Sequence, residues 1–71
     1  MRPVEEFIEA AVSASPAITH FGVAVKRERE GLLWGASIRS PGLPDIFSTA
    51  ETPERAASLA YSFYVSNSFK V

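Results

Sequence analysis

Cysteine is absent from this 71-residue chain, and histidine occurs only once, at position 20. Without cysteine there is no disulfide, no thiolate zinc site and no thiol chemistry, which favours an intracellular protein. A hydrolytic triad needs a nucleophile, a base and an orienting group, and His20 is the only imidazole that could take part. Gly-x-Ser-x-Gly, Walker and Gly-x-Gly-x-x-Gly patterns are also missing. The sequence therefore predicts a protein that is not an enzyme and that holds no cofactor or metal.

Long hydrophobic runs and an excess of positive charge are lacking as well. No apolar run is long enough to cross a bilayer, and Glu5, Glu6 and Glu9 interrupt the apolar pattern that a signal peptide would need. We therefore expect a soluble, cytoplasmic protein that does not contact a membrane. The formal net charge is −1, which argues against polyanion binding as the main activity.

The residues that are present predict one domain with a two-layer core, because a chain this short buries only about 60% of its unfolded surface. Residues 3–14 are predicted to form a helix behind Pro3, with apolar residues on one face: Val4, Phe7, Ile8, Ala11 and Val12. From residue 18 the apolar period changes to two, which predicts strands at 18–27 and 32–39 joined by a turn at 28–31.

The stretch 43–56 carries the most specific local pattern. Ile46 and Phe47 favour a strand over about 45–50, bounded by the prolines that precede it. Thr52 followed by Pro53 and Glu54 is typical of a helix start, because the threonine hydroxyl can cap the first turn and the acid suits the helix dipole. The last helix is predicted at about 52–66. Its sheet-facing stripe is expected to be Ala56, Leu59, Ala60 and Phe63.

This order predicts an α+β fold, helix-strand-strand-strand-helix, with a three-stranded antiparallel sheet and both helices on one face. Trp34 shares its strand parity with Ile38 and is expected in the core. Phe7 and Phe63 are expected to anchor the two helices. The opposite face of the sheet would stay uncovered and would show small and sparsely charged residues: Gly22, Ala24, Leu33, Gly35, Ser37 and Arg39.

Two surfaces are therefore candidates for protein contact. One is the uncovered sheet face around Leu33, Ser37 and Arg39. The other is the aromatic side of the last helix, since tyrosine is enriched at interfaces. Packing of these rings against the first helix is the alternative. On this second surface the predicted contact residues are Tyr61, Tyr64, Val65 and Phe69.

A nucleic-acid contact through Lys26, Arg27 and Arg29, aided by Arg39, is the alternative function. Glu28 and Glu30 interleave with these cations, so a solvated hairpin tip is the simpler interpretation.

Two further features have plain structural explanations. His20 is interpreted as a hydrogen-bonded strand residue, with ligand binding on the open face as the alternative. Glu5 and Glu9 are interpreted as a solvated helix face, with metal binding as the alternative.

Residues 43–56 also resemble a known family. The strand-turn-helix pattern here is similar to that of the HicB-like antitoxin domain, which has a partial ribonuclease-H-like fold. The matching residues are Leu43, Pro44, Phe47, Ser48, Glu51, Thr52, Glu54 and Ala56. The element order is similar to that of a double-stranded-RNA-binding domain. The first resemblance implies a domain that covers a nucleic-acid-processing partner, such as a nuclease or an RNA-binding toxin. Small inhibitors that phages make against host nucleases, including anti-CRISPR proteins, are similar in size.

Together these patterns predict a small non-enzymatic module that binds, and thereby inhibits, another protein. A homodimer could use either of the two candidate surfaces.

Overall fold

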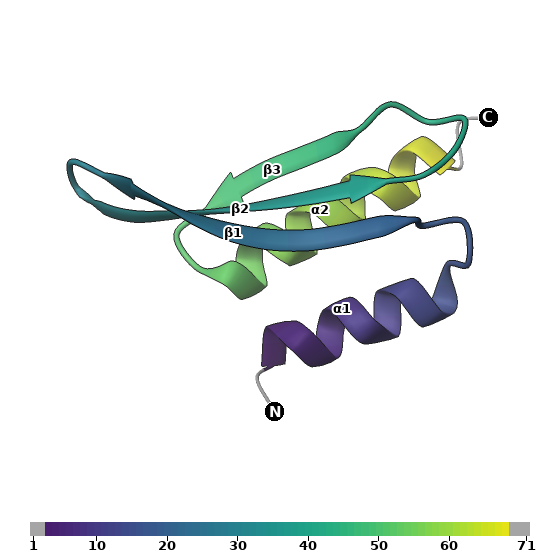
Figure 1. Ribbon diagram of the computed structural model, residues 1–71, viewed down its shortest axis with the longest axis horizontal. Helices are drawn as coiled ribbons and strands as arrows, with labels where there is room; N and C mark the ends of the chain where they lie inside the picture. Colours follow the sequence, from purple (N-terminus) through teal and green to yellow (C-terminus); the bar gives the residue numbers. More distant parts are fainter. Residues whose placement is uncertain (1–2, 69–71) are drawn as a thin grey trace.

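The chain folds as a helix, three strands and a second helix. A computed structural model describes residues 3–68. Both helices lie on the same face of a single antiparallel sheet whose strand order is β1-β2-β3 (Figure 1). The elements are α1 (Pro3–Ala14), β1 (His20–Glu28), β2 (Gly31–Arg39), β3 (Ile46–Ala50) and α2 (Pro53–Ser68). The predicted α+β fold is confirmed.

Turn chemistry sets the strand ends. Gly31 closes the β1–β2 hairpin with a φ of 138°, a conformation that glycine adopts without a steric penalty. The first strand begins at His20, two residues later than predicted, and Ile18 before it is buried in the core. The N–H of Thr19 donates to the carbonyl oxygen of Arg39 at 2.8 Å, which fixes the entry to β1.

The start of α2 follows the capping pattern in the sequence. The N–H of Arg55 donates to Oγ1 of Thr52 at 3.2 Å, and Pro53 is the first helical residue. One buried side-chain bond then ties the helix to the sheet. Ser48 on β3 donates through Oγ to the carbonyl oxygen of Ala56 at 2.9 Å. The predicted cap is confirmed, and β3 and α2 are held together at the turn that joins them.

The core lies between the sheet and α2, and the helix is rotated from the predicted orientation. Phe63, expected in the sheet-facing stripe, is 50% exposed, whereas Tyr64 is only 6% exposed. The buried residues of α2 are Ala56, Ala57, Ala60 and Tyr64. Three alanines on one face bring the helix close to the sheet, and the large ring of Tyr64 fills the space beyond them. The predicted stripe was therefore right at Ala56 and Ala60 and wrong at Phe63, whose place in the core is taken by Tyr64.

An aromatic cluster joins α1 to the rest of the fold. The ring of Phe7 meets Phe21 and Tyr61 edge-on, at centroid distances of 6.4 and 5.8 Å. Tyr61 stacks on Tyr64 at 6.2 Å. Tyr61 and Val65 are partly buried against the core. The expectation of a free aromatic surface on α2 was therefore wrong for Tyr64, which is buried, whereas Tyr61 and Val65 are partly buried and Tyr61 packs against Phe7 of the first helix.

The hairpin tip extends beyond both helices (Figure 1). Val25 and Leu32 face the helix side of the sheet by parity, yet they are 48% and 51% exposed because no helix lies beneath them. Trp34, nearer the helices, is partly buried against the core as predicted. Within residues 3–68 no helix is both long and apolar enough to cross a membrane.

Candidate functional site

The face of the sheet that is turned away from the helices is uncovered in the described part of the chain. Strand register assigns its residues, since side chains directly opposite one another in an antiparallel pair point to the same side. Phe21 pairs with Ile38, and both belong to the helix side. The alternate residues form what we call the open face: His20, Gly22, Ala24, Lys26, Leu33, Gly35, Ser37, Arg39, Phe47 and Thr49.

A shallow trough of about 360 Å³ runs across the open face. Its floor consists of residues with little or no side chain, among them Gly22, Ala24, Gly35 and Ser37. Lys26 and Leu33 border it toward the hairpin tip, and His20 and Phe47 are also among its lining residues. Ala24 is exposed, so a ligand group can approach the strand backbone closely at that position.

Phe47 is the largest apolar group on this surface. It lies on β3, is 67% exposed, and its ring lies over Gly35 on the neighbouring strand. A Cβ atom added at Gly35 would stand 3.0 Å from Cζ of Phe47. Because Gly35 has no side chain, the ring of Phe47 can pack directly on the backbone of β2, an arrangement known to stabilise glycine within sheets. The other side of the ring faces solvent.

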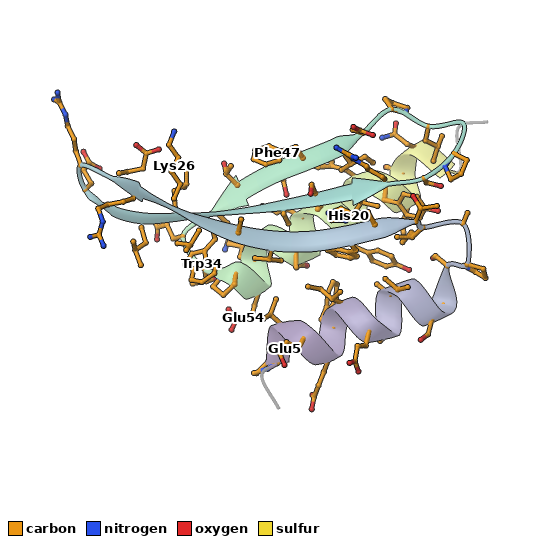
Figure 2. All side chains as sticks on the ribbon, viewed as in Figure 1. Glu5, His20, Lys26, Trp34, Phe47 and Glu54 are labelled. Carbon is orange, nitrogen blue, oxygen red and sulfur yellow. The ribbon has the colours of Figure 1, made fainter. Side chains whose placement is uncertain are left out.

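His20 lies over Gly22 in a comparable way. A Cβ atom added at Gly22 would stand 3.0 Å from Nε2 of His20. Figure 2 shows His20 and Phe47 on different strands of the sheet. Two flat rings over two glycines thus give the trough a surface that is apolar in its middle and polar at His20.

The charges of the open face are largely balanced by neighbouring acids. Nζ of Lys26 lies 3.6 Å from Oε1 of Glu28, and Nε of Arg39 lies 3.5 Å from Oδ2 of Asp45. All four side chains are well exposed, so these pairs contribute little to stability. Their effect is on the surface potential, because each cation at the rim has an anion beside it.

The three cations of the hairpin do not form one surface. Lys26 pairs with Leu33 on the open face, whereas Arg27 pairs with Leu32 on the opposite side. Arg29 lies in the turn between the strands. Figure 2 shows Lys26 and Trp34 leaving opposite sides of the hairpin, so Trp34 does not lie beside Lys26 to stack on a base.

The metal alternative gains no support from the geometry. Glu5 and Glu9 are exposed on α1, and within residues 3–68 no group of three His, Cys, Asp or Glu side chains comes close enough to hold an ion.

The predicted contact residues separate into two sets. Leu33, Ser37 and Arg39 lie in one row along β2 on the open face, as expected. Tyr64 is buried, Tyr61 and Val65 are partly buried, and Phe69 falls outside the described residues.

Sequence reasoning missed Phe47, the most exposed large apolar residue described. Its position in the strand held the signal, because Phe47 lies between Ile46 and Ser48. Both of these are buried, so Phe47 points to the opposite face. A five-residue strand bounded by prolines gives only two such alternations, too few to assign the faces from periodicity alone.

No protein-family model, curated protein or solved structure matches this chain. The resemblances to the HicB-like antitoxin domain and to the double-stranded-RNA-binding domain therefore stay predictions.

Proposed function

We propose that this chain is a protein-binding module that acts in the cytoplasm without catalysing a reaction, and that its open face is the docking surface. The observation that carries the proposal is Phe47, whose ring is 67% exposed beside a trough floored by glycine, alanine and serine. A large exposed ring next to a concave apolar surface is typical of protein contact sites.

The shape of the trough suggests what docks there. A sheet covered by helices on one face only can accept a further apolar layer on the other. An amphipathic helix of the partner fits best, with its apolar side chains against the ring of Phe47 and over Ala24 and Leu33. From the family resemblance we propose that this partner processes nucleic acid and that docking inhibits it.

Capture from the source cell with three baits tests the docking surface. Wild type and Phe63→Glu should recover the same protein, whereas Phe47→Glu should recover at least about tenfold less, because a carboxylate would replace the apolar contact. Phe63 is the matched control because it is half exposed but lies on α2, away from the open face. The captured protein should then bind the purified chain with the same dependence on Phe47.

Equal recovery by Phe47→Glu and wild type would contradict the proposal. So would loss with Phe63→Glu alone, which would move the contact surface to α2.

Nucleic-acid binding through Lys26, Arg27 and Arg29 makes a different prediction. A protein that neutralises several phosphates binds steeply more tightly as salt falls, with a slope of roughly one unit per phosphate contacted. We expect titration with duplex and single-stranded nucleic acid to give no measurable affinity even at low salt. A steep salt dependence that Arg27→Ala and Arg29→Ala reduce would favour the nucleic-acid function instead.

A further inference from the structure

The two edges of the sheet differ in what lies beside them. The outer edge of β1 has α1 beside it, whereas within residues 3–68 nothing lies beyond the outer edge of β3 (Figure 1). Among the helices and strands, β3 contacts only β2 and α2, and α2 lies beneath the sheet. Prolines flank the strand, but Ile46–Ala50 contains no proline and no charge, the features that usually block an edge. The outer edge of β3 can therefore pair with another strand.

The flank of α2 that faces this edge is apolar. Tyr61 packs on Phe7 and so marks the flank turned toward α1. Leu59 and Phe63 are each two residues from Tyr61, about 200° around the helix, so they lie on the opposite flank. Leu59 and the last two residues of β3 line the same surface hollow, which agrees with this placement. Phe63 is 50% exposed. An apolar helix flank thus lies next to the free strand edge without covering it.

The outer side of α2 also lacks the charges of an ordinary surface helix. Glu54 and Arg55, in the first turn, are its only charged residues. The exposed positions farther along include Ser58, Ser62 and Ser66. Small uncharged side chains let a second helix approach closely, and no charge would have to be desolvated. This side of α2 is therefore suited to contact with another helix.

We propose that a second copy of this chain covers both surfaces, by antiparallel pairing of β3 with β3 about a two-fold axis at Phe47. The two sheets become one sheet of six strands, and the two α2 helices become neighbours beneath it. An extended segment of another protein could pair with the strand edge, but it would leave Phe63 exposed. A second copy covers the strand edge and the helix flank together, because the two-fold axis matches each of these elements with itself.

The spacing of the layers suits this arrangement. α2 packs mainly beneath β2 and β3, and it runs along β3 in the opposite direction (Figure 1). Strands lie about 4.8 Å apart, so two helices placed this way are separated by about two strand spacings, roughly 10 Å. Packed helices are usually about 8–10 Å apart. The twist of the sheet rotates the two helices by about 40–50°, close to the commonest crossing angle of packed helices.

The register follows from parity and charge. An axis through a residue keeps both helices on one face of the joined sheet, whereas an axis between two residues would place them on opposite faces. An axis at Ser48 would oppose Asp45 and Glu51 at both ends of the pairing, and like charges directly opposite are unfavourable. An axis at Phe47 places Asp45 opposite Thr49 instead. Axes nearer either end of β3 would pair fewer of its residues.

This register brings Leu59 to the axis. The bond from Oγ of Ser48 to the carbonyl oxygen of Ala56 fixes how far along the strand α2 lies. Phe47 is one strand residue farther, about 3.3 Å, which equals about two helical residues. Position 58 is therefore level with the axis, and the Leu59 side chains of the two copies meet there. The charged first turns of the two antiparallel helices lie at opposite ends of the pair, so like charges stay apart.

The two contact surfaces are short. α2 is about 24 Å long, and the strand pairing covers residues 45–49 of each copy. Stable interfaces bury about 1,200–2,000 Å² in total. We therefore expect an interface at the lower end of this range and a dissociation constant in the micromolar range.

The pairing does not rest on the proposed docking function. The ring of Phe47 leans over Gly35 on β2, away from the outer edge of β3. The trough on the open face therefore stays accessible in the dimer, and one chain can use both surfaces.

Sedimentation equilibrium of the whole chain tests the pairing. Wild type should shift from 7.7 kDa to twice this mass within the micromolar range. Leu59→Glu and Leu59→Lys should each weaken self-association at least about tenfold, because two like charges would meet at the axis. An equimolar mixture of the two variants should form a mixed dimer at concentrations where each alone is monomeric, since opposite charges then meet.

Val12→Glu is the matched control. It places the same acid on an exposed apolar helix residue, but on α1, at the far side of the sheet from β3 (Figure 1). It should leave self-association unchanged, and circular dichroism melting shows whether each variant is folded. Amide hydrogen exchange of the wild type gives a readout that needs no variant. Protection of β3 should rise with protein concentration, whereas protection of β1 should not.

A chain that stays at 7.7 kDa at about 1 mM would overturn the dimer. A dimer that tolerates both Leu59 variants, or that only Val12→Glu breaks, would overturn the pairing through β3. A mixture of folded Leu59 variants that stays monomeric would overturn the placement of the axis. Monomeric Leu59→Glu should still capture the partner that wild type captures, so loss of the dimer and loss of docking are measured separately.

Discussion

Replacing Tyr64 with alanine should lower the free energy of unfolding by about 3–5 kcal/mol, the usual cost of removing a buried aromatic ring. Tyr64 is 6% exposed and packs in the central cluster beside Ala60 and Ile38. It also stacks on Tyr61, so its loss would weaken the aromatic group that holds α1. A domain of this length has about 5–10 kcal/mol of stability in total, so the variant should be near the limit of folding.

Phe63→Ala is the matched control. The two aromatic residues are neighbours on the same helix, but Phe63 is half exposed, so its truncation should cost only about 1 kcal/mol. Urea unfolding followed by the fluorescence of Trp34, the only tryptophan, measures both variants. Equal loss in the two variants, or a larger loss for Phe63→Ala, would show that the helix is rotated back toward the stripe predicted from sequence.

This pair of residues shows where sequence reasoning reached its limit. The start of α2 was predictable, because the capping chemistry of Thr52 and Pro53 is local. The rotation of α2 was not. Alanine, tyrosine and serine give its sequence a weak apolar stripe, and Phe63 looked like the natural core residue. The actual orientation depends on α1, whose Phe7 needs Tyr61 as a partner, and that contact joins positions 54 residues apart.

The sheet was more predictable than the helices. Its alternation of apolar and small residues correctly assigned Leu33, Ser37 and Arg39 to the open face. The pattern could not predict how much of each strand the helices would cover. Val25 and Leu32 follow the apolar parity but lie on a hairpin tip that no helix reaches. Coverage of a strand depends on the length and placement of the elements packed against it, and neither is encoded within the strand.

The centre of that sheet provides the second large effect. Ile38→Ala should lower the free energy of unfolding by about 2–5 kcal/mol. Ile38 is 1% exposed on the central strand, where it pairs with Phe21 on one side and Ile46 on the other. The lost side chain would leave a cavity that Phe21 and Ile46 cannot fill, because each is held in place by its own strand.

Leu32→Ala tests whether this cost comes from burial. Leu32 lies on the same strand, has the same parity and loses nearly the same volume, but it is 51% exposed beyond the helices. Its truncation should cost about 1 kcal/mol or less. The difference between the two midpoints in urea therefore reports the packing contributed by α2. If the midpoints fell together, α2 would not cover the Ile38 end of the sheet, and the two-layer core would have to be reassigned.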